Sequence, residues 1–116
     1  MGYIIILLVV AFAVWRMLPA KGVHSISTEQ LKQDLNNKNK QYIDVRTPAE
    51  YKGNHIRQFK NIPLYQLAEK TKDLSKDKEI VVICQSGMRS SKACKQLKKA
   101  GFTNITNVQG GMNQWS

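Results

Sequence analysis

A cysteine at the end of an apolar run is the residue in this chain that could most clearly do chemistry. Cys84 directly follows the β-branched segment Ile80–Ile83, and a short glycine-containing loop, residues 85–89, comes next. A helix is predicted from Ser90 onward. Loop amides can form an anion-binding nest around the sulfur, and a helix N-terminus adds positive partial charge. Both effects favour the thiolate, which is the nucleophilic form of cysteine.

The same motif has a second interpretation, in which Cys84 is an inert buried residue in an ordinary β–α turn. The other potential metal ligands do not cluster around it. Cys94 does not form a C-x-x-C pair with Cys84, and His24 and His55 are far apart in the sequence. We therefore expect no metal site and no disulfide framework, which fits a reducing compartment. Cys94 falls on the predicted inner face of its helix and is interpreted as a core residue.

The charge of the chain limits its expected partners. The 116 residues carry a formal net charge of +10, and the basic residues are spread along the whole sequence. They are not interleaved with aromatic residues as in single-strand nucleic-acid binders, so no nucleic-acid partner is expected. A cationic field attracts small anionic substrates or an anionic lipid surface. For most of the lysines, a solvated surface is the simpler explanation.

The N-terminal segment differs from the rest of the chain. Residues 3–15 are apolar without interruption, Arg16 follows, and Pro19 ends the predicted helix. A secretory signal peptide would carry its basic residues before the apolar run, whereas Arg16 and Lys21 come after it. A core element would show an amphipathic face, which this segment lacks. We therefore predict an uncleaved transmembrane anchor over residues 1–19.

The anchor prediction carries a topology with it. At 1.5 Å per residue, residues 2–18 span about 25 Å, slightly less than the roughly 30 Å hydrocarbon core of a bilayer. A short single span is feasible, with lipid contacts through residues 2–18. The positive-inside rule places Arg16 and Lys21 on the cytoplasmic side. The chain is thus expected to be a single-pass membrane protein with a cytoplasmic catalytic domain.

The remaining residues alternate between strand and helix patterns. Residues 20–25 form a linker and first strand, and residues 26–116 form one domain. Strands are predicted at residues 23–26, 42–45, 59–62, 80–83 and 105–108, and helices at residues 27–35, 48–52, 64–70 and 90–100. Such alternation indicates an α/β fold, a parallel sheet with helices on both faces. The site is then expected at the carboxyl ends of the strands, where Asp44, Arg46 and Cys84 lie.

Four segments after the anchor together resemble a single-domain rhodanese, a thiosulfate sulfurtransferase-like domain. They are Asp-Val-Arg-Thr-Pro-Ala-Glu-Tyr at 44–51, His-Ile at 55–56 with Asn-Ile-Pro at 61–63, the cysteine loop at 84–90, and Gly-Gly at 110–111 with Trp115. One stretch departs from the family pattern. Gln58 and Phe59 stand where the family has two small residues, which implies a different loop packing there.

The resemblance implies a rhodanese-like parallel sheet and a double displacement that needs no cofactor. Cys84 would take the sulfane sulfur of thiosulfate or a similar anionic donor and form a persulfide. The persulfide would then pass its sulfur to cyanide or a thiol. The residues implied to bind the substrate and the persulfide are Gln85, Ser86, Gly87, Met88, Arg89 and Ser90.

Three charged residues are expected to support the loop. Arg89 would orient it through an acidic partner, either Asp44 or Glu50, and would secondarily attract the anionic donor. Arg46 would line the mouth of the pocket. A purely structural ion-pair network is the favoured interpretation of Asp44, Arg46 and Glu50, and His55 is interpreted as a structural turn residue.

Two other functions remain open at the level of sequence. Cysteine phosphatases and arsenate reductases place five residues between cysteine and arginine, whereas four separate Cys84 from Arg89. The smaller loop suits one sulfur atom better than a tetrahedral oxyanion. A membrane-tethered persulfide carrier or redox-sensing module is the other alternative. Cys84 would then gain either one sulfur atom or an oxidised form.

Overall fold

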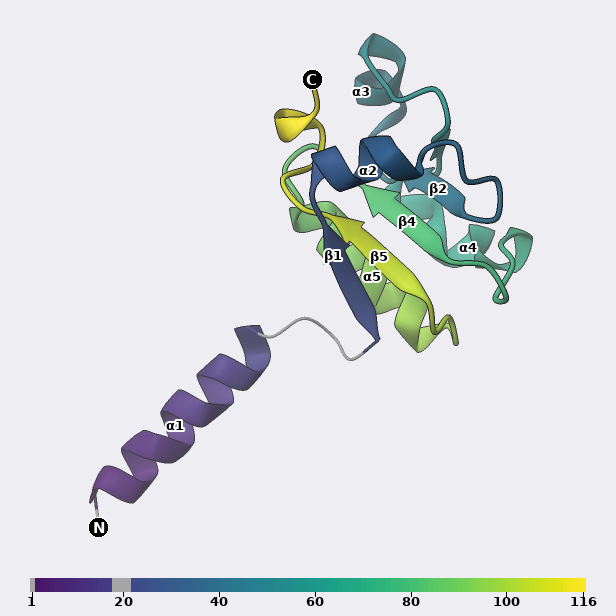
Figure 1. The fold of residues 1–116 in the computed structure, drawn as a ribbon. Helices are drawn as coiled ribbons and strands as arrows, with labels where there is room; N and C mark the ends of the chain where they lie inside the picture. Colours follow the sequence, from purple (N-terminus) through teal and green to yellow (C-terminus); the bar gives the residue numbers. More distant parts are fainter. Residues whose placement is uncertain (1, 18–21) are drawn as a thin grey trace.

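A five-stranded parallel sheet forms the centre of the fold in the computed structural model, which describes residues 2–17 and 22–116 (Figure 1). The strand order is β1-β5-β4-β2-β3, and each neighbouring pair is parallel. The strands are β1 (Val23–Ile26), β2 (Gln41–Asp44), β3 (Lys60–Asn61), β4 (Ile80–Ile83) and β5 (Ile105–Val108). All four β4 residues are buried, as their β-branched run predicted.

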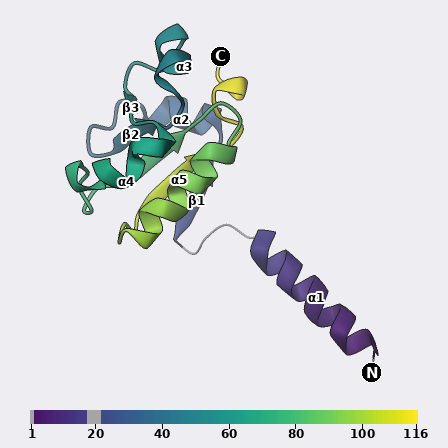
Figure 2. The same cartoon turned by 180° about the vertical axis from the view of Figure 1, so that it is seen from behind.

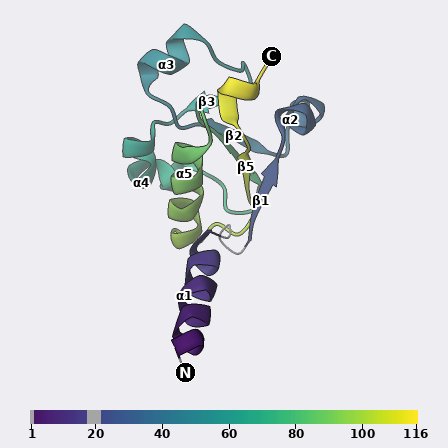
Figure 3. The same ribbon diagram turned by 90° about the vertical axis from the view of Figure 1, so that its left-hand side faces the viewer.

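Helical elements cover both faces of this sheet, as the alternating pattern predicted (Figures 2 and 3). The α-helices are α1 (Gly2–Met17), α2 (Thr28–Asp34), α3 (Pro48–Gly53), α4 (Leu67–Lys70) and α5 (Met88–Lys99), and the 3₁₀ turns are η1 (Leu64–Gln66), η2 (Thr71–Asp73) and η3 (Gly111–Gln114). On one face, α4 and α5 contribute Leu67 and Leu97 to a buried cluster with Val82. On the other face, α2 contributes Leu31, which packs with Val81.

Local capping chemistry determines where two of these helices begin. Ser27 and Gln30 form a capping box before α2, in which each side chain binds the other's backbone amide. Thr47 and Glu50 form the same arrangement at α3, where Pro48 occupies the first helical position. These positions were readable from the sequence because the partners are three residues apart.

Other boundaries differ from the prediction. The helix expected from residue 90 begins at Met88, because Gly87 adopts a left-handed conformation with φ of 106° and turns the chain directly into α5. The helix expected at residues 64–70 divides into η1 and α4. Phe59, which departs from the family pattern, is 2% exposed and packs in the α2-side core.

The N-terminal segment is helical, but the predicted transmembrane helix is not found. α1 has 16 residues, which corresponds to about 24 Å of helix. Within the described part of the chain, no helix is both long enough and apolar enough to cross a membrane. Residues 1 and 18–21, which include parts of the predicted anchor and linker, lie outside the described residues. In all three ribbon views α1 points away from the sheet.

Candidate active site

Cys84 lies directly after β4, at the carboxyl edge of the sheet, and its residue is fully buried. The backbone N–H of Gly87 donates a hydrogen bond to its Sγ over 3.0 Å. The Oγ of Ser90, in the first turn of α5, is 3.3 Å from the same sulfur. The loop therefore curls around the sulfur and places it at the helix N-terminus, where negative charge is stabilised.

The protonation of Cys84 reflects two opposing effects. Burial raises the pKa of the thiol, but hydrogen bonds from the Ser90 hydroxyl and from nearby backbone amides bring the pKa below its ordinary value of 9.0. The amides belong to Ser86, Gly87 and Ser90. These donors bind the thiolate more strongly than the neutral thiol, and together they outweigh the cost of desolvating the thiolate.

The Ser90 hydroxyl can form hydrogen bonds with two partners, the Cys84 sulfur and the Gly87 carbonyl oxygen. Its Oγ also donates to the backbone carbonyl of Gly87 over 3.1 Å. While Cys84 is a thiol, its S–H can donate to Ser90 Oγ and the hydroxyl proton remains on the Gly87 carbonyl. When Cys84 loses its proton, the hydroxyl can rotate and donate to the sulfur instead. Ser90 can thus serve both protonation states without moving its backbone.

Arg89 closes the loop through an ion pair with α3. Its Nη1 and Nη2 donate to Oε1 and Oε2 of Glu50 over 2.6 and 2.9 Å. This paired geometry, with the Thr47 capping bonds, lowers the pKa of Glu50 to about 2. Of the two partners that the sequence left open for Arg89, the structure selects Glu50.

Asp44 instead pairs with Arg46 at the end of β2. The Arg46 Nη2 lies 2.9 Å from Asp44 Oδ2, and the two side chains are 3% and 0% exposed. The Nε of Arg46 also donates to the carboxylate, and its Nη2 donates to the carbonyl of Asn54 over 2.5 Å. The Nδ2 of Asn61 donates to the carbonyls of Asp44 and Arg46, which ties this corner to β3. The pair is buried and hydrogen-bonded on several sides, the arrangement that a buried charge requires.

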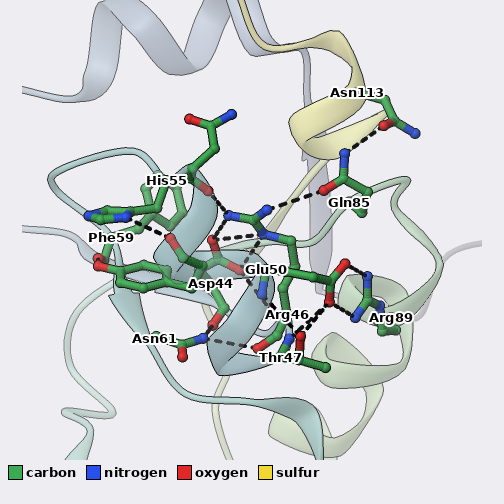
Figure 4. A network of polar contacts seen from close by, with 12 residues as sticks. Asp44, Arg46, Thr47, Glu50, His55, Phe59, Asn61, Gln85, Arg89 and Asn113 are labelled. Carbon is green, nitrogen blue, oxygen red and sulfur yellow. Dashed lines mark hydrogen bonds and ion pairs between the residues drawn. The ribbon is translucent and has the colours of Figure 1, made fainter.

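Gln85 connects that corner to the end of the chain (Figure 4). Its Oε1 accepts from Arg46 Nη1 over 3.2 Å, and its Nε2 donates to Asn113 Oδ1 over 2.6 Å. Because the guanidinium can only donate, the Gln85 carbonyl oxygen must face Arg46. The first loop residue is therefore held between β2 and η3.

Sequence reasoning did not identify the C-terminal turn as a support of the loop. The backbone N–H groups of Met112 and Asn113 donate to the carbonyls of Cys84 and Gln85 over 2.8 and 2.9 Å. At Gly111, a Cβ would lie 2.2 Å from the Cys84 carbonyl oxygen, so only glycine fits there. The adjacent glycines at 110 and 111 were the available signal for this close approach.

The other predicted residues take peripheral positions. Ser86 on the loop and Met88 at the start of α5 are exposed, whereas Cys94 is 1% exposed and burial raises its pKa to about 12. His55 stacks on Tyr51, with 3.9 Å between ring centroids. Among residues 2–17 and 22–116, no group of three or more histidine, cysteine or acidic residues could hold a metal ion.

Comparisons with known proteins agree with this geometry. The model of the rhodanese-like domain family matches residues 27–116. The putative sulfurtransferase YtwF of Bacillus subtilis is 43% identical over 94 residues, which cover 80% of this chain and 90% of YtwF. The uncharacterized protein YqhL of the same organism is also 43% identical, over 65% of this chain, but the chain spans only 60% of YqhL.

A solved structure supports the same assignment. The rhodanese-like domain protein of Staphylococcus aureus is 33% identical, with a TM-score of 0.75 over 80% of this chain and 91% of that one. Three findings agree: the cysteine loop lies at the carboxyl edge of a parallel sheet, the family model matches most of the chain, and these relatives are similar in sequence and fold. The chain belongs to the family of rhodanese-like domains.

Proposed function

We propose that this protein is a sulfurtransferase that carries sulfane sulfur as a persulfide on Cys84. The observation that carries the proposal is the set of donors around the sulfur, with the Gly87 amide at 3.0 Å and the Ser90 hydroxyl at 3.3 Å. These groups lower the pKa of Cys84 and so favour the nucleophilic thiolate at the start of α5. The relatedness to proteins named as sulfurtransferases adds support.

In the first half-reaction, the Cys84 thiolate attacks the outer sulfur of thiosulfate or a similar donor. A bond forms between Sγ and that sulfur while the donor's S–S bond breaks, and sulfite or another anion leaves with the electron pair. The product is a persulfide anion on Cys84. The loop amides and the N-terminus of α5 offer hydrogen bonds to this anion without a metal or cofactor.

In the second half-reaction, a thiol or cyanide acceptor takes the terminal sulfur. The acceptor's lone pair forms the new bond to sulfur, the persulfide bond breaks, and its electrons return to Cys84 as a thiolate. No net oxidant or reductant is consumed. Cys94 is unsuited to act as the acceptor, because burial raises its pKa to about 12.

The experiment loads the full chain with a sulfane-sulfur donor and measures Cys84 by mass spectrometry. Wild-type protein should gain the mass of one sulfur atom at Cys84 and lose it when a thiol acceptor is added. The Cys84→Ser variant should gain none and keep its fold, because serine preserves the volume but offers no accessible anion.

Cys94→Ala is the matched control for this experiment. It should load sulfur like the wild type, at a stability cost of about 1 kcal/mol for the small cavity. Sulfur transfer by a folded Cys84→Ser protein would falsify the proposal. Loading that depends on Cys94 would also contradict it.

We also propose that residues 2–18 contact lipid. Large apolar side chains of α1 are exposed, including Ile5 at 65% and Leu8 at 65%. Transfer of such side chains from water to a lipid interface is favourable. The contact that we propose is with a membrane surface, and we propose in addition that the domain lies on its cytoplasmic side.

A further inference from the structure

One side of α5 presents a stripe of exposed side chains to solvent. Its members follow one another at intervals of four, three and four residues, which places them on one face of the helix; they are Met88, Lys92, Lys95 and Lys99. Met88 is 73% exposed, and the three lysines are exposed as well. We call these four residues the α5 stripe.

The lysines of the α5 stripe have no negative charge to balance them. α5 contains neither aspartate nor glutamate. In the part of the chain that the structure describes, none of the ion pairs includes Lys92, Lys95 or Lys99. Like charges three and four positions apart on a helix repel each other. A negatively charged group from outside the domain would relieve this repulsion.

A groove lies beside the α5 stripe. The η1–α4 segment and α5 cover the same face of the sheet (Figure 2). Two adjoining clefts of about 330 and 460 Å³ lie between them and share Leu64, Tyr65 and Gln96. Lys99 lines one cleft, and Arg89, which is bound to Glu50, lines the other. Among the described residues that line the two clefts, none is acidic.

The exposed apolar side chains of the domain gather at the same place. Outside α1, the described residues leave two large apolar side chains exposed, Tyr65 at 70% and Met88 at 73%. Tyr65 lines both clefts, and Met88 is the first residue of the α5 stripe. An aromatic side chain at a cleft with a charged rim is typical of protein–protein interfaces.

We infer that the α5 stripe and the groove form a docking surface for an acidic segment of a partner protein. The segment places an apolar side chain in the groove against Tyr65 and its carboxylates on the lysines of the α5 stripe. A membrane matches this surface less well, because a flat layer of headgroups can meet the lysines but does not fill a cleft. The inference goes beyond sulfur transfer and does not depend on it.

The first experiment measures binding of a synthetic peptide to the full chain in a neutral detergent. The peptide has a central leucine–phenylalanine pair flanked on both sides by glutamates, and it carries a fluorescent label for anisotropy. Replacing its glutamates with glutamines, or its apolar pair with serines, should each weaken binding at least about tenfold. Both the charge and the apolar contact are therefore tested.

Two variants with the same change in charge locate the binding surface. The first removes the lysines of the α5 stripe, as Lys92→Gln with Lys95→Gln and Lys99→Gln. The control removes three exposed cations on and after α3, as Lys52→Gln with Arg57→Gln and Lys60→Gln. The first variant and Tyr65→Ala should each bind the peptide at least about tenfold more weakly, and the control should bind like the wild type. All three should load sulfur on Cys84 at the wild-type rate.

A map of lysine acetylation in the wild-type chain gives a second readout that needs no variant. The peptide should protect Lys92, Lys95 and Lys99 from acetylation and leave Lys52 and Lys60 reactive. Vesicles that contain phosphatidylglycerol should leave the lysines of the α5 stripe reactive. If the vesicles protect them instead, the surface binds lipid and the inference is wrong.

Three further results would also overturn the inference. They are equal binding of the glutamate and glutamine peptides, equal loss of binding in the two triple variants, and no protection of the α5 stripe by the peptide. None of these results bears on sulfur transfer, because loading of Cys84 is measured separately. Conversely, a wild-type chain that binds the peptide but loads no sulfur would contradict the proposed function and leave the docking surface intact.

Discussion

At the scale of single residues, the reactivity of Cys84 depends on donors that outweigh its burial. Burial alone would raise its pKa, and the net lowering comes from hydrogen bonds to the charged sulfur. Ser90 is the side chain among these donors, and it is itself fully buried. Its hydroxyl is therefore the most direct point at which to test the activation of the thiolate.

We expect Ser90→Ala to raise the pKa of Cys84, because burial remains while the hydroxyl donor is lost. The thiolate fraction at neutral pH should fall, and with it the rate of alkylation and of sulfur loading. The measurement is the rate of alkylation by iodoacetamide as a function of pH. The midpoint should move to higher pH in the variant.

Ser91→Ala is the matched control at the next position. The Ser91 hydroxyl accepts from Asn107 Nδ2 over 3.3 Å rather than facing the cysteine. This variant should keep the wild-type midpoint. If Ser90→Ala and wild type titrate together, the hydroxyl does not contribute to the activation of Cys84.

At the scale of secondary-structure elements, one ion pair joins the starts of α3 and α5. Glu50 completes the capping box of α3 and also binds Arg89 in the first turn of α5. The pKa of Glu50 falls to about 2 from an ordinary value of 4.5. A carboxylate with a depressed pKa in the folded state stabilises the protein above pH 4.5 and loses this effect as the pH falls toward 2.

We expect Glu50→Gln to lower the free energy of unfolding by about 1 kcal/mol at neutral pH. The loss is smaller than for a buried ion pair, because both side chains are about one-third exposed to solvent. Glutamine preserves the capping box, so the substitution removes mainly the charge. The measurement is denaturant unfolding of the variant and the wild type at several pH values. The difference between their free energies of unfolding should become smaller as the pH is lowered below 4.5.

Glu69→Gln provides the comparison for this series, because Glu69 is an exposed carboxylate on α4. Glu69→Gln should change the free energy of unfolding only slightly at every pH. The charge of Glu50 should stop contributing between about pH 4.5 and pH 2. If the difference in the free energy of unfolding between wild type and Glu50→Gln stays constant down to pH 3, Glu50 acts through packing rather than charge.

At the scale of the whole molecule, α1 and the α/β domain contribute different properties. α1 exposes large apolar side chains, with Tyr3, Ile6 and Leu7 each more than 60% exposed. The sheet and its covering helices have two buried clusters of their own. We therefore expect the domain to fold and transfer sulfur without α1, and α1 to supply the lipid contact.

The test compares the full chain with a chain that begins at Lys21. Both should unfold within about 2 °C of each other and load sulfur at equal rates. The full chain should sediment with phosphatidylglycerol-containing vesicles, and the shorter chain should stay in solution. Aggregation or early unfolding of the shorter chain would assign the segment to the domain core. Failure of the full chain to bind vesicles would contradict the lipid proposal.

The sequence alone determined the features that depend on neighbouring residues. The buried run Ile80–Ile83, the cysteine after it and helices close to residues 27–35 and 48–52 were all predicted, and the structure contains them. Each rests on burial periodicity or on partners within three residues, which short segments specify by themselves. The alternation of such segments was enough to predict the parallel sheet and its two helical layers.

Only the tertiary structure decided which distant groups meet around Cys84. Arg89 and Glu50 are 39 positions apart, and Gln85 and Asn113 are 28 apart. Asp44 was an equally good partner for Arg89 in the sequence, but β2 ends with Asp44 facing Arg46 instead. These pairings follow from β4 lying beside β2 and from η3 returning beneath the loop. The order of the strands and the position of η3 against the cysteine loop depend on packing of the whole core, which no local sequence pattern encodes.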